Sequence, residues 1–378
     1  MPSSGLSPAA CSLSSLLVAP TEATCESLDA SLFAAAVDHG VAPLLAYAIS
    51  TRGLLEHIPD KLRARMTRTL REAAVLDEVA RYEQARVTAR FEAAGVRALL
   101  FKGAALSATH YPQSWLRPRG DVDVLVSRAQ AETAAAALES IGYRRALQPQ
   151  GAMVTHQARF WAPDTAGDFA CDVHWRVVDP FAFAEAFPFD ELWSRSVGGD
   201  TQQVRLVAPT DALLIACAHR AAHHHDSDRV LLLYDIDRIA RRLSPAEWEC
   251  FARLAATHGL RAVSRRGLDL ASALFATPVP RSTWACLAGD HGEPSARFVA
   301  GGMRRVDVLR SDLARLSTWR DRVRLLREHL FPARSYMAAK YGYRWRILLP
   351  WCYAGRLLCG AARWFRPLAP PATIAREP

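Results

Sequence analysis

Two aspartates one residue apart carry the strongest chemical signal in the sequence. Asp121 and Asp123 begin the apolar stretch 121–126, which is typical of a strand. Successive side chains of a strand point to opposite faces, so both carboxylates lie on the same face. Like charges at this distance need a cation, and Mg²⁺, with Mn²⁺ as an alternative, takes carboxylate and phosphate oxygens as ligands. The pair predicts half of a metal–phosphate site. The alternative is the solvated face of an edge strand.

A Lys-Gly pair upstream is a candidate for the phosphate contact. Lys102 and Gly103 lie between a predicted strand at residues 96–101 and a predicted helix at residues 104–109. A glycine lets backbone N–H groups approach a phosphate, and a helix N-terminus favours negative charge. The chain has three lysines among 47 basic residues, which suggests that a compact ammonium is wanted at position 102. The alternative is a glycine needed only for turn geometry.

A third carboxylate lies on a later predicted strand. In residues 171–176, alternation places Asp172, His174 and Arg176 on one face. Asp172 could complete the metal site or act as general base on an attacking hydroxyl. The alternative is an ordinary amphipathic strand.

These three motifs together resemble the polymerase-β-like nucleotidyltransferase superfamily. More closely, the chain is similar to a bacterial family of largely uncharacterised nucleotidyltransferases with the motifs Lys-Gly, Arg…Gly-Asp-Ile-Asp-Leu-Leu-Val, and an acidic residue followed by x-His-Trp. The matching positions are Lys102-Gly103, Arg117 with residues 120–126, and residues 172–175. The resemblance covers approximately residues 97–237.

The resemblance implies an α+β core, a small mixed sheet with helices, flanked by N- and C-terminal helical segments. It implies Mg²⁺-dependent transfer of a nucleoside monophosphate from a nucleoside triphosphate, ATP being the expected donor, to a hydroxyl or phosphate acceptor with release of pyrophosphate. The acceptor stays open between a small molecule, a peptide, RNA and a protein. The implied metal and catalytic residues are Asp121, Asp123 and Asp172. Lys102, Gly103, Arg117 and Arg119 are expected to bind the triphosphate, and the alternative for Arg117 and Arg119 is a solvated loop.

Two departures from the wider superfamily weaken the phosphate motif. Ala104 follows Gly103 where a hydroxyl or a second glycine is usual, and the spacing from Gly103 to Asp121 is long. The first departure and the basic C-terminal segment favour the alternative of a non-catalytic nucleotide-binding or accessory protein on the same fold. A toxin-like transferase that modifies RNA or protein is a further alternative, which the basic segment permits.

A histidine-rich segment gives secondary candidates. His219 and His223 are four residues apart and share a helix face, which is one half of a zinc site, but the sequence specifies no third ligand. Asp235 follows Tyr234, and a similar pair occurs in the related family after a His-containing helix. His174 is a further candidate. Histidines that only make structural hydrogen bonds at a domain junction are the alternative.

Length and periodicity predict four regions in the 378 residues. These are an N-terminal helical region (1–94), the nucleotidyltransferase core (95–209), a helical domain (210–300), and a basic, aromatic-rich helical segment (301–378). Further strands are expected at residues 143–147, 154–161 and 169–178, and Ser127 is expected to cap the helix that runs to residue 141. Later helices are expected at residues 212–225, 230–242, 245–257 and 261–274.

The basic charge is concentrated in the last region. Residues 301–378 contain sixteen Arg or Lys and five Asp or Glu, whereas the net charge of the whole chain is +9. The segment 341–366 also mixes aromatic and basic residues, which suits an anionic membrane surface or a nucleic acid. We nevertheless expect a pair of amphipathic helices packed on the body with arginines outside, and the anionic partner is the alternative.

The eight scattered cysteines favour reduced thiols, and no apolar run is long enough to span a bilayer. These features predict a cytoplasmic protein, with peripheral membrane attachment through the C-terminal segment as one option.

Overall fold

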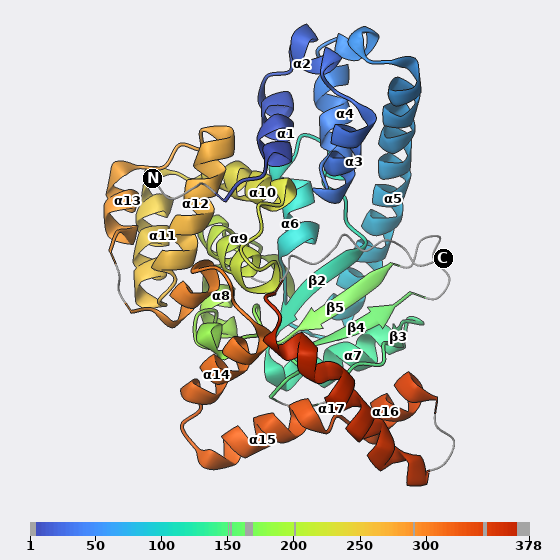
Figure 1. Ribbon diagram of the computed structural model, residues 1–378, viewed down its shortest axis with the longest axis vertical. Coiled ribbons are helices and arrows are strands. Elements are labelled where there is room, and N and C mark those ends of the chain that lie inside the picture. Colours follow the sequence, from blue (N-terminus) through green and yellow to red (C-terminus); the bar gives the residue numbers. More distant parts are fainter. Residues whose placement is uncertain are drawn as a thin grey trace.

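A six-stranded mixed sheet lies at the centre of the molecule, with helical groups around it (Figure 1). The computed structural model describes residues 5–149, 151, 153–162, 169–199, 202–289, 292–342 and 346–368. The strands are β1 (Ala98–Leu100), β2 (Asp121–Val126), β3 (Arg144–Arg145), β4 (Gln157–Trp161), β5 (Ala170–His174) and β6 (Val204–Leu206).

Three groups of helices surround the sheet, and they follow one another along the chain. The N-terminal group is α1 (Pro8–Val18), α2 (Glu22–Glu26), α3 (Ala30–Asp38), α4 (Ala42–Ser50) and the long α5 (Asp60–Ala93). Within the sheet region lie α6 (Lys102–His110), α7 (Ala131–Glu139) and α8 (Phe189–Arg195). The second group is α9 (Pro209–His223), α10 (Val230–Ala240), α11 (Pro245–Thr257), α12 (Arg261–Phe275) and α13 (Arg281–Leu287). The last group is α14 (Arg305–Arg315), α15 (Trp319–Leu330), α16 (Arg334–Tyr341) and α17 (Leu349–Phe365).

The strand order β3-β4-β5-β2-β1-β6 puts β2 between β5 and β1. β2 is parallel to β5, and this register places Asp123 beside Asp172. β2 is antiparallel to β1, with Val124 opposite Leu100. The carboxyl end of β1 therefore lies next to the beginning of β2, and α6 begins there. The pairing brings the Lys-Gly turn and all three predicted carboxylates to one edge of the sheet.

The two faces of the sheet have different tasks. On one face Val122, Val124 and Val173 belong to a buried core with Phe91 of α5 and Leu138 of α7. The other face carries Asp121, Asp123, Asp172 and His174, because side chains alternate along each strand. One face thus anchors the sheet on α5 and α7 and leaves the other available for chemistry.

The far end of the polar face joins a second, larger core. Leu125 of β2 and Leu99 of β1 are buried in it with Leu45 of α4, Leu213 of α9 and Ile236 of α10. The N-terminal helices and the α9–α12 group therefore share one apolar core with this face. Burial of this extent fixes the helices α9 and α10 relative to β2.

Some of the predicted elements differ from the structure. The strand expected at residues 143–147 is paired only at Arg144–Arg145, and the strand expected to reach residue 178 ends at His174. Arg176 therefore lies beyond the strand, where its guanidinium contacts His156 instead of joining the carboxylates. The backbone of Ser127 precedes a short 3₁₀ turn, and its side chain makes no capping hydrogen bond. The strand β6 was not predicted.

The prediction that the C-terminal helices pack with their apolar residues inward is wrong for several side chains. Trp351, Leu358 and Phe365 of α17 are 75%, 78% and 62% exposed. Trp319 of α15 is 69% exposed. None of the described helices is long and apolar enough to cross a membrane. The division of the chain into four domains stays a prediction.

Candidate active site

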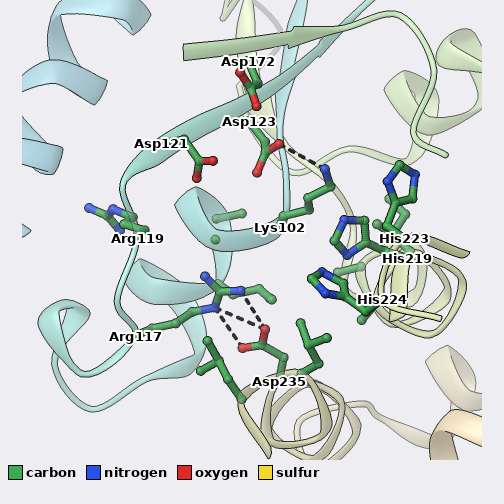
Figure 2. A pocket seen from close by; sticks show the side chains of 18 of the residues that line it. Lys102, Arg117, Arg119, Asp121, Asp123, Asp172, His219, His223, His224 and Asp235 are labelled. Atoms are coloured by element: carbon green, nitrogen blue, oxygen red, sulfur yellow. Dashed lines mark hydrogen bonds and ion pairs between the residues drawn. The ribbon is translucent and has the colours of Figure 1, made fainter. Parts of the chain in front are cut away.

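The three predicted carboxylates lie together, and each has a cationic partner in the protein (Figure 2). Asp123 accepts a hydrogen bond from Lys102, with 3.0 Å between Nζ and Oδ1. Its Oδ1 also lies 2.8 Å from Nε2 of His174. Asp172 accepts two hydrogen bonds from Arg159, from Nε and Nη2, each at 2.8 Å. Asp121 is the most open of the three carboxylates, with 37% of its side chain exposed and Arg159 Nη2 at 3.4 Å.

The surroundings shift the pKa of Asp121 and the pKa of Asp123 in opposite directions. Burial, with the charges of Asp123 and Asp172, raises the pKa of Asp121 to about 7. Burial acts in the same direction on Asp123, but Lys102 and the hydrogen bond with His174 outweigh it and hold the pKa of Asp123 below its usual range. The site therefore contains more carboxylates than its own cations neutralise.

The backbone at Lys102 is in an unusual conformation that serves this contact. Its φ is +51°, in the left-handed region that residues with a Cβ rarely adopt. Antiparallel pairing of β1 with β2 brings the turn close, and the N–H of Phe101 donates to the carbonyl of Asp123 at 3.4 Å. Such strain persists where the surrounding structure determines it, often at functional sites. Here it accompanies an ammonium directed at Asp123.

Gly103 is required by a close neighbour. A Cβ at this position would lie 2.5 Å from Nη1 of Arg117. That guanidinium cannot easily move away, because Asp235 of α10 accepts from its Nε and Nη2 at 2.7 to 3.2 Å. Tyr111 donates a further hydrogen bond to Asp235 at 2.7 Å. Position 103 therefore requires glycine because the turn packs against a buried ion pair. This requirement is independent of any contact with phosphate.

Arg119 points away from the carboxylates and toward α5 (Figure 2). Its Nη2 lies 3.2 Å from Oδ1 of Asp77, and only 3% of its side chain is exposed. Arg117 and Arg119, two residues apart, therefore face different partners on opposite sides of the loop.

A cavity of about 410 Å³ opens over the carboxylates, between the sheet and the helices α9 and α10. Small-molecule sites are commonly of this size. Apolar residues line one part of it, among them Leu106, Ile215 and Leu231. The predicted residues that line it are Lys102, Gly103, Arg117, Arg119, Asp121, Asp123, Asp172, His219, His223 and Asp235. His174 contacts Asp123 from within the sheet and is not among the lining residues.

Three histidines form the wall opposite Asp121 (Figure 2). The rings of His219 and His223 are stacked with centroids 4.9 Å apart, and His224 meets His219 edge-on at 4.9 Å. Burial, and then the charge of Lys102, lower the pKa of His223 to about 3. Burial also lowers the pKa of His224 to about 3. At neutral pH this wall is uncharged, polar and aromatic.

The chain offers one group of side chains with metal-ligand spacing within its described residues. Ligand atoms of Asp123, Asp172 and His174 all lie within 4.8 Å of one another. His219 and His223 share a helix face as predicted, but they belong to no such group. Within the described residues this spacing therefore occurs at Asp123, Asp172 and His174, a group that does not include Asp121, and not at the histidine wall.

Sequence reasoning missed two cations in this region. Arg159 of β4 binds Asp172, and Arg229, which precedes α10, lines the cavity. The alternation in β4 could have placed Arg159 on the polar face, because Ala158 and Phe160 are the apolar residues around it. No local pattern in the sequence points to Arg229.

The mixed sheet, the strand–helix turn at Lys102 and the carboxylates on adjacent strands define the core of a nucleotidyltransferase. A family model described as "Uncharacterised nucleotidyltransferase" matches residues 28–276, and the chain belongs to this family. No curated protein matches the chain. The chain is thus a transferase, as predicted, and the family does not specify its acceptor.

The left-handed backbone at Lys102 predicts that a glycine variant is more stable than an alanine variant, the reverse of the usual order in a helix. Lys102→Gly and Lys102→Ala both remove the ammonium, so their difference isolates the backbone. Because alanine is disfavoured in the left-handed region, the free energy of unfolding of Lys102→Gly should be higher by about 1 kcal/mol. Urea denaturation measures this difference. At the exposed Glu72, in the interior of α5, the alanine variant should instead be the more stable by about 1 kcal/mol. If the same variant, glycine or alanine, were the more stable at both positions, the result would contradict backbone strain at Lys102.

Proposed function

We propose that the chain transfers a nucleoside monophosphate from a nucleoside triphosphate, with ATP as the expected donor, to a hydroxyl or phosphate of an acceptor. Pyrophosphate is the leaving product. One observation carries the proposal: Asp121, Asp123 and Asp172 converge beside Lys102 at the floor of one cavity. Membership of the nucleotidyltransferase family gives this arrangement its chemical direction.

The residues at the site suit a hard divalent cation. Mg²⁺, or Mn²⁺ in its place, prefers oxygen ligands, and the three carboxylates supply them. Three carboxylates face two cations, Lys102 and Arg159, and burial together with the charges of Asp123 and Asp172 raises the pKa of Asp121. We assign Asp121, Asp123 and Asp172 as the ligands. His174 then orients Asp123 through their hydrogen bond. When bound, the cation neutralises phosphate charge and polarises the phosphoryl oxygens.

The remaining residues bind and orient the donor. Lys102 is the most direct phosphate contact, because its ammonium lies at the carboxylate edge of the cavity. Arg117 adds positive charge, with Nη1 as the nitrogen that makes no bond to Asp235. Both oxygens of Asp172 accept from Arg159, which counts against a general-base role because a paired carboxylate is a weaker base. Catalysis of this kind depends on position and charge more than on covalent steps.

The far part of the cavity suits the nucleoside. Apolar residues of α9 and α10 and the neutral histidine wall provide surfaces on which a base can pack without a charge penalty. His219 and His223 are the stacked pair in this wall.

Removing the negative charge of the paired carboxylates should abolish transfer. The double variant Asp121→Asn, Asp123→Asn should reduce metal-dependent pyrophosphate release by about 100-fold or more, because the charge that holds the cation and the phosphates is lost. The assay uses α-labelled nucleoside triphosphates with cell extract as the source of acceptors, and the labelled product identifies the acceptor. Asp190→Asn, at a carboxylate that is 85% exposed, serves as the control.

Unchanged transfer and unchanged magnesium-dependent nucleotide binding in the double variant would show that these carboxylates are not the site. Metal-dependent nucleotide binding without any labelled product or pyrophosphate would favour the non-catalytic alternative.

We also propose that the basic C-terminal segment binds an anionic membrane surface peripherally. Trp351, Leu358 and Phe365 are seven residues apart, close to two helical turns, so they form one exposed apolar stripe along α17. Trp319 and Val323 form a similar stripe on α15 and are 69% and 52% exposed.

Charge complementarity selects the partner. Sixteen of the 47 basic residues of the chain lie in residues 301–378, the segment that carries these stripes. Apolar and aromatic stripes flanked by arginines are typical of helices that lie in the interface of an anionic bilayer. Figure 1 shows α15, α16 and α17 extending from the body below the sheet.

Charged substitutions in the stripe should weaken vesicle binding. Trp351→Glu with Leu358→Glu should reduce co-sedimentation with phosphatidylglycerol-containing vesicles by about tenfold or more, because apolar burial is lost and negative charge is added. Val75→Glu with Tyr82→Glu, at two exposed positions of α5, is the matched control. Equal binding of wild type and stripe variant, binding equally well to neutral vesicles, or displacement of the vesicles by RNA would contradict a membrane surface as the partner.

A further inference from the structure

A second cavity of about 640 Å³ lies between α5 and α6, separate from the nucleotide cavity. Arg81, Gln84 and Thr88 of α5 form one wall, and Ser107 of α6 contributes to another. Arg119 is the residue that lines both cavities. The second cavity is thus built mainly from polar side chains, two of them arginines.

The polar groups at this cavity are incompletely bonded within the protein. Arg119 is 97% buried at its side chain, yet its Nε and Nη1 have no hydrogen-bond partner in the protein. The Oε1 of Gln84 is also buried without a partner. Asp77, which does not itself line this cavity, lies within ion-pair distance of Arg119, and its Oδ1 accepts no hydrogen bond.

These four atoms are a large share of the buried side-chain polar atoms that lack a hydrogen-bond partner. In the described residues, ten buried side-chain nitrogen or oxygen atoms lack a hydrogen-bond partner, and these four belong to Asp77, Gln84 and Arg119. Leaving buried donors of a charged group unpaired is costly, so such atoms call for a bound partner. The cavity beside them has room for one.

We infer that this second cavity binds the anionic group of the acceptor, a carboxylate or a phosphate, on Arg119 and Arg81. The oxygens of such a group would accept from the unpartnered nitrogens of Arg119. A hydroxyl or amino group on the same molecule would donate to Oε1 of Gln84. Arg81 adds a second guanidinium at the rim, where it is 58% exposed and pairs with Glu78.

The position of Arg119 relates this cavity to the reaction. Arg119 lies two residues before Asp121 and on the opposite side of the loop from Arg117. Because Arg119 lines both cavities, an acceptor whose anionic group it holds would lie at the boundary between the second cavity and the nucleotide cavity. This assignment rests on the proposed nucleotidyl transfer, and it adds the chemical class of the acceptor.

Direct binding of simple anions tests the inference without any turnover. Inorganic phosphate and malonate are titrated calorimetrically into the wild type, Arg119→Gln and Arg81→Gln. Each variant should weaken the binding of the preferred anion, Arg119→Gln by about tenfold or more, as expected from the loss of a charge-assisted hydrogen bond. Arg71→Gln, at an exposed arginine of α5 outside this cavity, should bind as the wild type does.

Lys102→Met separates this site from the nucleotide cavity. Because Lys102 lines only the nucleotide cavity of the two, anion binding in the second cavity should persist in this variant even when nucleotide binding is lost. If Arg119→Gln does not fold, as judged by circular dichroism, the exposed Arg81→Gln still tests the site, with an expected loss of about threefold or more.

The outcomes are distinct. Binding of phosphate alone indicates a phosphorylated acceptor, binding of malonate alone indicates a carboxylate, and either supports the site when the Arg119 or Arg81 variant weakens it. Absence of binding by either anion overturns the inference, as does binding that both arginine variants retain or that Lys102→Met abolishes. If the wild type binds an anion in the second cavity but transfers no nucleotide, the result counts against the proposed function and not against this anion site.

Discussion

The parallel register of β2 and β5 sets Asp123 directly beside Asp172, and this forced proximity of like charges organises the site. Two carboxylates at this distance, with Asp121 next to them, are costly to bury unless cations surround them. The chain supplies Lys102 to one and Arg159 to the other. Two cations thus face three carboxylates, and burial together with the charges of Asp123 and Asp172 raises the pKa of Asp121. The remaining charge is what a divalent cation and its bound phosphates would balance.

The surrounding fold maintains this unfavourable arrangement. The opposite face of the sheet is apolar and is fixed on α5 and α7, so the carboxylates cannot turn away. The loop before β2 is held on both sides, by Arg117 with Asp235 of α10 and by Arg119 with Asp77 of α5. Gly103 lets the Lys102 turn approach that loop closely. Apolar packing on one face and the paired arginines in the loop thus offset the unfavourable free energy of burying the carboxylates.

Local patterns predicted what depends on local geometry. Alternation alone placed Asp121 and Asp123 on one face, and the strand–turn–helix pattern placed Lys102 at the end of β1. Local patterns could not predict the long-range partners of the arginines. Asp235 is 118 residues from Arg117, and Asp77 is 42 residues from Arg119, so no periodicity relates them. The triphosphate role predicted for Arg119 came from its place beside Arg117, whereas the structure gives the two side chains different partners. Asp172 was predictable as a carboxylate on a strand, but Arg159 as its partner required the pairing of β4 with β5.

The central claim is that a divalent cation binds where the three carboxylates meet. A crystal of the protein grown with Mn²⁺ and a non-hydrolysable ATP analogue tests it directly through the anomalous signal of manganese. We expect an anomalous peak in contact with carboxylate oxygens of Asp121, Asp123 and Asp172, with phosphate oxygens of the analogue completing the coordination. A nucleotide bound in the cavity with no manganese at these carboxylates, or manganese bound at the histidine wall instead, would contradict it.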